Sequence, residues 1–389
     1  MKRGPSGQTW TTSSGGEAVP AFVPNCLPPE PALDLTTLQS SLEKALLALG
    51  HLDSLSVLLP DTHLFLYTYV RKEAVLSSQI EGTQSTLSDL LLYEFEESPG
   101  VPLDDVTEVS NYVVALEHGM SRLDDGFPLC NRLVREIHEK LLGRGRGSNK
   151  MPGEFRRSQN WIGGTRPGNA RFVPPPPETV EDCMADLERF YHSQSEDLPA
   201  LLRAGLAHVQ FETIHPFLDG NGRVGRLMIT LALYQAGIVR EPLLYLSLYF
   251  KQHRDRYYAL LDEVRKDGDW EAWTQFFLAG VEQTAQGAVS TAQRLLQLFR
   301  QDRTRLQQEG RKAGSALRVH QVLQKRPVTS LQFVADNTKL SFPAVSRGMG
   351  LLEQLGIVRE LTGQKRNRLF GYQQYISILD QEPNPPTQT

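Results

Sequence analysis

The chain has 389 residues, of which 40% are hydrophobic and 22% charged, and its formal net charge is −4. This composition is typical of a globular protein of two or three domains and excludes wholesale disorder. No run approaches the ~18 consecutive apolar residues of a membrane helix, and the first residues lead into no apolar secretory segment. We therefore expect a cytoplasmic protein without a membrane partner. Its three cysteines, Cys26, Cys130 and Cys183, are too scattered for a disulfide framework or a zinc ribbon.

The first third of the chain is expected to be helical behind a short tail. Residues 1–20 are rich in Gly, Ser and Thr and predict a flexible tail. The prolines of residues 21–34 favour an extended segment. Apolar residues spaced by three or four then predict helices as far as residue 122, with a break at Pro60. Residues 21–122 thus form a predicted N-terminal helical region.

The middle of the chain alternates between helical patterns and one glycine- and proline-rich stretch. Residues 153–177 contain Gly-Gly, Pro-Gly and four consecutive prolines between short β-forming pairs, which predicts a short β-hairpin or flap. Helical spacing predicts the remaining elements at 130–147, 178–194, 198–213, from Gly225 to about 237, and over 247–310. We assign residues 123–290 to a helical core and 291–314 to a helical linker.

The C-terminal part differs from the rest in charge. Residues 311–375 hold eleven Lys or Arg against three Asp or Glu, a net charge of +8, so the remainder carries −12. Residues 315–375 have the pattern of a winged helix-turn-helix, with three short helices, a basic turn and a β-forming end. Residues 376–389 are expected to be a tail. The asymmetry indicates a separate module with its own partner, and DNA bound through residues 315–375 is one candidate.

The most informative stretch connects two predicted helices. It reads His215-Pro216-Phe217-Leu218-Asp219-Gly220-Asn221-Gly222-Arg223-Val224-Gly225-Arg226. Its glycines open the second helix, so the loop presents free backbone N–H groups at the positive end of a helix dipole, which favours anions. Its two arginines supply donors suited to phosphate oxygens. Asp219 offers a hard oxygen for Mg²⁺, and His215 is the natural general base. Such a loop predicts transfer of a nucleotide to a hydroxyl.

Three other interpretations of these residues are weaker. Residues 220–225 match G-x-G-x-x-G with Glu241 about twenty residues on, but a dinucleotide site needs a preceding strand and the preceding segment is helical. The triplet starting at His253 resembles a kinase catalytic loop, but Leu260 stands where a metal-binding Asn is required and no D-F-G follows. A purely structural role for His215 is disfavoured by its eleven neighbours.

The twelve residues match the signature of the Fic family at every defined position, and the resemblance extends over most of the chain. Residues 21–122 resemble the Fic N-terminal region, residues 153–177 the family's flap, and residues 244–277 its closing helices. The resemblance implies a mostly α fold: a Fic helical core with a short β-hairpin flap, behind the N-terminal helical region and before the winged-helix domain. It also implies transfer of AMP from ATP to a Ser, Thr or Tyr hydroxyl of a target protein.

The resemblance assigns roles to individual residues. His215 would deprotonate the hydroxyl, and Asp219 would hold Mg²⁺ on the phosphates. ATP would contact Gly220, Asn221, Gly222, Arg223, Val224, Gly225 and Arg226, with Tyr257 and Tyr258 packing the adenine. Ile162, Gly163, Gly164 and Thr165 of the flap would align the target by backbone pairing. A glycine at position 222 leaves room for the orientation of ATP that favours AMP transfer over phosphoryl transfer.

A second motif resembles the inhibitory pattern of the family's second class. Residues 77–82 read Ser-Ser-Gln-Ile-Glu-Gly, and Ser77 and Glu81 are spaced to share one helix face. The resemblance implies that Glu81 pairs with Arg226 and so disfavours productive ATP binding. Relatives also modify themselves, remove AMP by means of this glutamate, or form homodimers, and the sequence separates none of these. The alternative function is that of a DNA-binding regulator with the Fic core as a nucleotide sensor.

Overall fold

The computed structural model describes residues 1–14, 16–58, 63–95, 103–193, 198–364 and 366–381. The fold is mostly helical, as predicted, with one two-stranded and one three-stranded sheet in the described residues. Pro60, the predicted helix break, lies outside the described residues. The elements in chain order are β1 (Gly7–Ser14), β2 (Glu17–Pro24), α1 (Leu35–Leu58), α2 (His63–Ile80), α3 (Leu87–Tyr93), α4 (Leu103–Asp124), α5 (Asn131–Leu141), α6 (Val180–His192), α7 (Ala200–Ile214), α8 (Asn221–Gln235), α9 (Ser247–Gln252), α10 (Arg254–Asp267), α11 (Trp270–Gln307), α12 (Ala313–Lys325), β3 (Val328–Ser330), α13 (Leu331–Thr338), α14 (Phe342–Gln354), β4 (Arg359–Glu360), β5 (Leu369–Gly371) and α15 (Gln373–Asp380). Three short 3₁₀ helices, Pro167–Asn169, Pro177–Thr179 and Gly310–Lys312, complete them.

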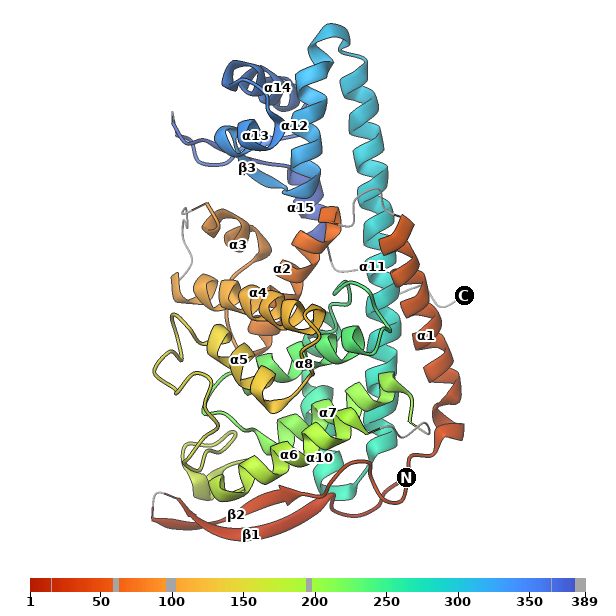
Figure 1. Cartoon of the computed structure of the whole chain (residues 1–389), viewed down its shortest axis with the longest axis vertical. Helices are drawn as coiled ribbons and strands as arrows, with labels where there is room; N and C mark the ends of the chain where they lie inside the picture. Colours follow the sequence, from red (N-terminus) through yellow and green to blue (C-terminus); the bar gives the residue numbers. More distant parts are fainter. Residues whose placement is uncertain (15, 59–62, 96–102, 194–197, 365, 382–389) are drawn as a thin grey trace.

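The 38-residue helix α11 runs along most of the long axis of the molecule, with α1 beside it (Figure 1). Its apolar face packs against the central helices. The ring of Trp273 is fully buried there, and its Nε1 donates to the carbonyl of Gly205 in α7 over 2.9 Å. Helix α11 is continuous as far as Gln307, so the predicted start of the linker at residue 291 lies within the helix.

Helices α7 and α8 form a buried antiparallel pair at the centre of the fold. Nearly all side chains of α7 are buried, including polar ones such as Glu212. Helices α2, α4 and α5 pack around this pair and close it on the side of the N-terminal region. The connection between α7 and α8 is therefore held from several sides.

The predicted N-terminal tail is wrong over most of its length. Residues 7–24 form an antiparallel hairpin in which Gly7 pairs with Pro24 and Ser14 with Glu17 (Figure 1). The hairpin is anchored because Phe22 donates its backbone N–H to the carbonyl of Val173 over 2.9 Å. Before it, Arg3 forms an ion pair with Glu271 of α11 over 2.6 Å. The Thr and Ser residues that suggested a tail are strand residues here, stabilised by a tertiary contact that local composition does not reveal.

Where the sequence predicts a flap hairpin at residues 153–177, the structure has one antiparallel bridge, between Ile162 and Phe172. Gly163 and Gly164 both adopt positive φ, which turns the chain away from an extended strand. The 3₁₀ turn at residues 167–169 lies in the loop that connects the two bridge partners. The prolines that follow lack the N–H groups that would continue a ladder.

The C-terminal elements form a compact unit at one end of the molecule (Figure 1). The strands pair antiparallel in the order β3-β5-β4, and α12, α13 and α14 pack against one another beside them. The tail predicted at residues 376–389 is wrong for its first five residues, which belong to α15 packed on α11, and residues 382–389 lie outside the described residues. The hydroxyl of Tyr372 donates to Asp302 of α11 over 2.5 Å, which ties this unit to the long helix.

Candidate functional site

The loop between α7 and α8 is shaped by two residues in the left-handed region. His215 ends α7 with φ 49° and ψ 60°, and Gly220 precedes α8 with φ 79°. A Cβ on Gly225 would lie 2.6 Å from Oε1 of Glu212, so glycine there permits close packing of the two helices. The backbone N–H of Val224 already donates to the carbonyl of Gly220 over 3.0 Å. The N–H groups that α8 leaves for an anion are therefore those before residue 224.

Asn221 shapes the loop from inside rather than facing a ligand. Its side chain is buried, accepts from the N–H of Phe217 and donates to the carbonyl of the same residue, each over 2.8 Å. Both polar atoms of the Asn221 side chain are thus engaged by the backbone of Phe217, and the side chain is not oriented for the predicted contact with phosphate. The side chain of Val224 is fully buried as well. Both residues contribute to the site through the path of the backbone.

His215 is held as a neutral imidazole. Burial, together with the positive charges of Arg156 and Arg265, lowers the pKa of His215 to about 3. Its Nδ1 has no hydrogen-bond partner among the described residues. A neutral imidazole with an unengaged ring nitrogen can accept a proton, which is the chemical requirement for a general base.

Arg156 holds the turn at His215 through hydrogen bonds to backbone carbonyl groups. Its side chain is 2% exposed, its Nε donates to the carbonyl of His215 over 2.9 Å, and its Nη2 donates to the carbonyl of Pro175 over 2.5 Å. Its own N–H also bonds the carbonyl of Pro216 over 2.9 Å. The sequence contained this arginine at the start of the flap but gave no signal for the contact. It ties the flap to the loop.

His138 of α5 is a second supporting residue that the sequence did not indicate. Its ring stacks on Phe217, with centroids 3.6 Å apart and planes 8° from parallel. Nδ1 accepts from the N–H of Gly153 over 2.9 Å, so Nε2 carries the proton and donates to the carbonyl of Asp219 over 3.1 Å. Burial lowers the pKa of His138 to about 4, which keeps this tautomer neutral.

The two residues of the second motif both contact Arg226. The resemblance implied the pairing with Glu81, whereas the contact with Ser77 was not predicted. Nε of Arg226 donates to Oγ of Ser77 over 2.9 Å, and Nη2 donates to the carbonyl of Ser77 over 2.9 Å and to Oε1 of Glu81 over 2.7 Å. Burial alone would raise the pKa of Glu81, but the charge of Arg226 outweighs it and holds that pKa below its usual range. A Cβ at position 222 would overlap Oε1 of Glu81, so Gly222 makes room for this carboxylate.

Arg223 is paired with a carboxylate that the sequence did not indicate. Its Nη1 lies 2.6 Å from Oε1 of Glu108 in α4, and both side chains are almost fully buried. Burial raises the pKa of Glu108 despite the neighbouring arginine. Glu108 would therefore compete with phosphate for the predicted contact with Arg223.

Asp219 lies at the mouth of the loop with a third of its side chain exposed. Its Oδ1 accepts from the N–H of Gly220 over 2.6 Å and lies 3.5 Å from Nη2 of Arg223. No cluster of three or more His, Cys, Asp or Glu that could hold a metal occurs in the described ranges. One exposed carboxylate fits a Mg²⁺ ion whose other ligands are phosphate oxygens and water.

The two tyrosines predicted to pack the adenine differ in exposure. Tyr257 is buried: its hydroxyl contacts Nε2 of His208 over 2.8 Å, and its ring stacks on Phe250 with centroids 4.7 Å apart. Tyr258 is partly exposed, with its ring centroid 5.0 Å from that of Tyr257. Both tyrosines lie close enough to Arg226 to favour its charged form and raise its pKa, which places them near the loop. Tyr258 is the better placed of the two to meet a ligand.

The flap residues predicted to align a target lie on the surface, but their backbone is partly engaged. Oδ1 of Asn169 accepts from the N–H groups of Thr165 and Arg166, each over 3.0 Å. Ile162 exchanges backbone hydrogen bonds with Phe172. Gly163 and Gly164 are exposed. The edge open to a partner strand is therefore shorter than the sequence predicts.

The protein is mostly helical, and the loop between α7 and α8 carries a buried imidazole at its start and leads into a helix that contains two buried arginines. Comparison with known proteins agrees. Residues 39–121 match the family model described as "Fic/DOC family N-terminal", and residues 128–233 match that described as "Fic/DOC family". Over these two segments the chain is similar to the Fic/DOC family.

A relative is similar in sequence, and two solved structures are similar in fold. The chain is 30% identical to the protein adenylyltransferase Fic of Drosophila yakuba over 208 residues, which cover 53% of this chain but only 39% of that relative. Its fold is similar to that of a Fic family protein from Desulfovibrio desulfuricans G20, with a TM-score of 0.55, 19% identity, and coverage of 89% of this chain and 98% of that one. A Fic domain containing signaling protein from Bacteroides thetaiotaomicron VPI-5482 has a TM-score of 0.50 and 22% identity, over 63% of this chain and 96% of that one.

No described helix combines the length and apolarity needed to cross a bilayer.

Proposed function

We propose that this protein transfers AMP from ATP to a hydroxyl group of a target protein, and that Glu81 restrains the reaction. One observation carries the proposal: the neutral imidazole of His215 and the buried guanidinium of Arg226 bracket a helix terminus with free N–H groups, and the one exposed partner of Arg226 is Glu81. A base, an anion site and a replaceable carboxylate are what such a transfer with internal restraint requires. The similarity to a protein adenylyltransferase supports the same reaction.

In the proposed reaction, His215 takes the proton of the target's hydroxyl. The hydroxyl oxygen bonds to the α-phosphorus of ATP, the bond from that phosphorus to the bridging oxygen breaks, and pyrophosphate leaves. Asp219 would hold Mg²⁺, which neutralises charge on the phosphates when bound. The N–H groups at the start of α8 and Arg226 bind the phosphates, while Arg156 and His138 keep the loop in shape.

Restraint follows from competition for one guanidinium. Glu81 and Ser77 take up donors of Arg226 that would otherwise face a phosphate. The carboxylate of Glu81 also fills the space beside Gly222. We propose that ATP binds productively when Glu81 leaves, and that the same glutamate, close to His215, is placed to activate water for removal of AMP.

The test is AMP incorporation from labelled ATP and Mg²⁺ into a cell lysate and into the protein itself. We expect His215→Ala to abolish incorporation in a Glu81→Gly background, a loss of at least about 10²-fold for removal of a general base. ATP binding by the same variant, measured by calorimetry, is expected to be unchanged. Full incorporation by His215→Ala would end the assignment of the base.

Removal of AMP is tested separately. Protein labelled by the Glu81→Gly variant is purified and incubated with the wild-type chain, and the AMP adduct is followed by mass spectrometry. Loss of the adduct with wild type but not with Glu81→Gln would support the second role of Glu81. A stable adduct in both would contradict it.

DNA binding through the C-terminal unit is the second candidate, which we propose from one surface feature. The elements follow the order of a winged helix-turn-helix, with α14 in the position of the recognition helix. A hollow at the start of α14 is lined by Phe342, Ser346, Arg366 and Arg368, so basic side chains lie beside an exposed helix end. A salt-dependent gel shift that the double change Arg366→Ala and Arg368→Ala weakens would support it. No shift at low salt would exclude it.

A further inference from the structure

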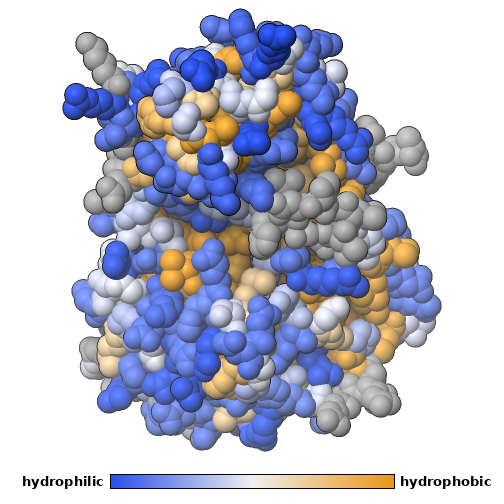
Figure 2. Space-filling view, turned by 45° about the horizontal axis from the view of Figure 1, so that its top comes forward, coloured by the Kyte–Doolittle hydropathy of each residue, from blue (hydrophilic) through white to orange (hydrophobic). Residues whose placement is uncertain are grey.

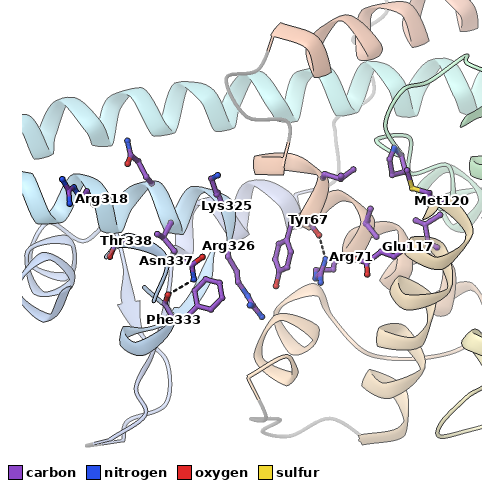
Figure 3. Close-up of a pocket in the computed structure, with 16 residues that line it drawn as sticks. Tyr67, Arg71, Glu117, Met120, Arg318, Lys325, Arg326, Phe333, Asn337 and Thr338 are labelled. Carbon is purple, nitrogen blue, oxygen red and sulfur yellow. Dashed lines mark hydrogen bonds between the residues drawn. The ribbon is translucent and has the colours of Figure 1, made fainter. Parts of the chain in front are cut away.

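The segment that carries Glu81 is attached to the C-terminal unit (α12 to α15) on both of its sides. Helix α2 leads into Glu81, and α3 follows it in the chain. An open cavity of about 700 Å³ lies between α2 and α4 on one side and α12 and α13 on the other (Figure 3). Figure 2 shows hydrophobic side chains in a hollow across the middle of the molecule. Because the cavity interrupts the packing of the two parts, the polar contacts around it decide how the C-terminal unit sits on α2 and α3.

The first link is formed by α15, which contacts α2 through two buried polar pairs. The hydroxyl groups of Thr68 and Tyr375 lie 3.2 Å apart, and both side chains are fully buried. The buried Lys72 donates from Nζ to the carbonyl of Leu379, in the last turn of α15. The spacing is four residues on both helices, so each helix uses one face for both contacts. An ammonium at the carboxyl end of a helix is favoured by the helix dipole, and a buried one is costly to leave without its acceptor.

The second link lies beyond the second motif, at the end of α3. Arg326, between α12 and β3, donates from Nη2 to Oε2 of Glu94 over 3.1 Å, and its guanidinium lies 4.2 Å from the centre of the Phe95 ring. That ring meets the ring of Phe333 in α13 edge-on, with centroids 6.2 Å apart. Glu94 is shared, because its Oε1 accepts from Nε of Arg71 in α2 over 2.6 Å, so one carboxylate faces two guanidinium groups. This carboxylate therefore joins α2, α3 and the C-terminal unit.

From these two links α2 runs to the loop between α7 and α8. The link to α15 uses residues 68–72, near the middle of the helix, whereas Ser77 and Glu81 contact Arg226 at its carboxyl end. Helix α2 is 18 residues long, and a helix with an unbroken ladder of backbone hydrogen bonds moves as one body. A change in how the C-terminal unit holds α2 therefore reaches the contact between Glu81 and Arg226.

We propose that the C-terminal unit is a second element of the restraint. By holding α2 through α15 and α3 through Arg326, it keeps Glu81 on Arg226, and displacement of the unit releases Glu81. Any partner of the C-terminal unit that favours another position of the unit thereby favours release. This regulation rests on the proposed function, because it acts on the restraint of that reaction by Glu81.

The two links are cut separately in the full chain. Thr68→Val removes the hydroxyl that meets α15, and its matched control is Thr274→Val, because each threonine also donates to a carbonyl of its own helix but Thr274 does so within α11. Arg326→Gln removes the charge beside Glu94, and Arg359→Gln, at an exposed position of the same unit, is its control. We expect AMP incorporation from labelled ATP to rise about threefold or more in each link variant, the scale of one hydrogen bond, and to stay unchanged in the controls. In a Glu81→Gly background neither link variant should add to the rise.

Amide hydrogen exchange of residues 77–82, followed by mass spectrometry, gives a second readout that needs neither ATP nor catalysis. We expect exchange there to be about threefold faster in both link variants than in wild type and in both controls. Urea denaturation of each variant shows that it folds. Unchanged incorporation and exchange in the link variants would overturn the proposal, and so would a rise that persists in the Glu81→Gly background, because the effect would then bypass Glu81. If Glu81→Gly itself transfers no AMP, the proposed function fails, and the exchange of residues 77–82 alone decides whether the C-terminal unit holds this segment.

Discussion

Two carboxylate–arginine pairs flank the same loop, and they differ in exposure. In one, Arg223 and Glu108 are both almost fully buried, with side chains 3% and 4% exposed. In the other, Arg226 is 2% exposed but the side chain of Glu81 is 34% exposed. If a buried carboxylate leaves, its arginine stays behind as an unpaired buried charge, which is costly. A carboxylate open to water on one side can be replaced by another anion. The difference distinguishes an arginine whose partner is locked in the core from one whose partner is open to solvent, and we expect only the second, Arg226, to exchange its partner for a ligand.

The pKa directions support this distinction. Burial raises the pKa of Glu108, so its ionised form is poorly compensated even beside Arg223. The pKa of Glu81 is lowered, because Arg226 outweighs the effect of burial. Burial therefore makes Glu108 a weaker acid. Glu81 is instead stabilised as an anion, at the position where phosphate is expected to bind.

The largest expected effect is on stability. Glu108→Ala removes the buried carboxylate beside Arg223 and leaves only the partly exposed Asp219 at 3.5 Å, and loss of one partner of a buried pair costs about 3–5 kcal/mol. Urea denaturation of wild type and variant measures the loss, and Glu117→Ala, at an exposed site on the same helix, is the control. A loss under about 1 kcal/mol, the range of surface pairs, would remove the contrast between the two pairs.

The next effect is on activity. Glu81→Gly frees Arg226 from a charge-assisted hydrogen bond, and since such bonds contribute about 1.5–3 kcal/mol, AMP incorporation is expected to rise about tenfold or more. The urea midpoint should change little in comparison with Glu108→Ala. Glu309→Gly, an exposed glutamate after α11, serves as the control and should have no effect on incorporation. Unchanged incorporation by Glu81→Gly would show that Glu81 does not restrain the reaction.

A smaller rise is expected for Ser77→Ala. The change removes the hydroxyl that accepts from Nε of Arg226, but the carbonyl of Ser77 and the carboxylate of Glu81 still accept from Nη2. Loss of one acceptor among three predicts an increase of roughly threefold, on the order of 0.7 kcal/mol. Ser78→Ala, at a buried position on the same helix, separates this effect from a general disturbance of α2. A rise as large as that of Glu81→Gly would mean that Ser77 alone holds Arg226.

The smallest effect is a difference in pH dependence. The pKa of Glu108 is raised in the folded state, so the folded protein keeps a proton that the unfolded chain releases, and its contribution to stability falls as pH rises above the usual range of glutamate. The pKa of Glu81 is lowered, so its contribution is present above that range and is lost as pH falls through the folded value. Urea midpoints of Glu108→Gln and Glu81→Gln, each compared with wild type between about pH 3.5 and 6, should therefore diverge in opposite directions. Parallel curves would contradict the assignment.

Much of the fold could be predicted from the sequence because it rests on local pattern. Apolar residues spaced by three or four gave the helical character of residues 35–58 and 200–214, and both segments are helices. The mostly α fold is confirmed, and residues 39–121 and 128–233 are similar to the Fic/DOC family models. The predicted boundaries of the winged-helix unit, and the roles assigned to His215, Asp219 and Tyr258, remain predictions. The hairpin of residues 7–24 was missed because its stability comes from Val173, about 150 residues away.

The sequence by itself determined the composition of the loop: twelve consecutive residues contain the candidate base, the glycines and both arginines, so neighbours in the chain are enough to indicate it. It also indicated Glu81, since a spacing of four places Glu81 on one helix face with Ser77. Only the tertiary structure decided which arginine has a buried carboxylate partner, because Glu108 lies 115 residues before Arg223 and no local pattern marks it. The support of the loop by His138 and Arg156, and the cavity between the N-terminal helices and α12, likewise arise from packing of distant segments, where burial rather than sequence spacing sets charge and position.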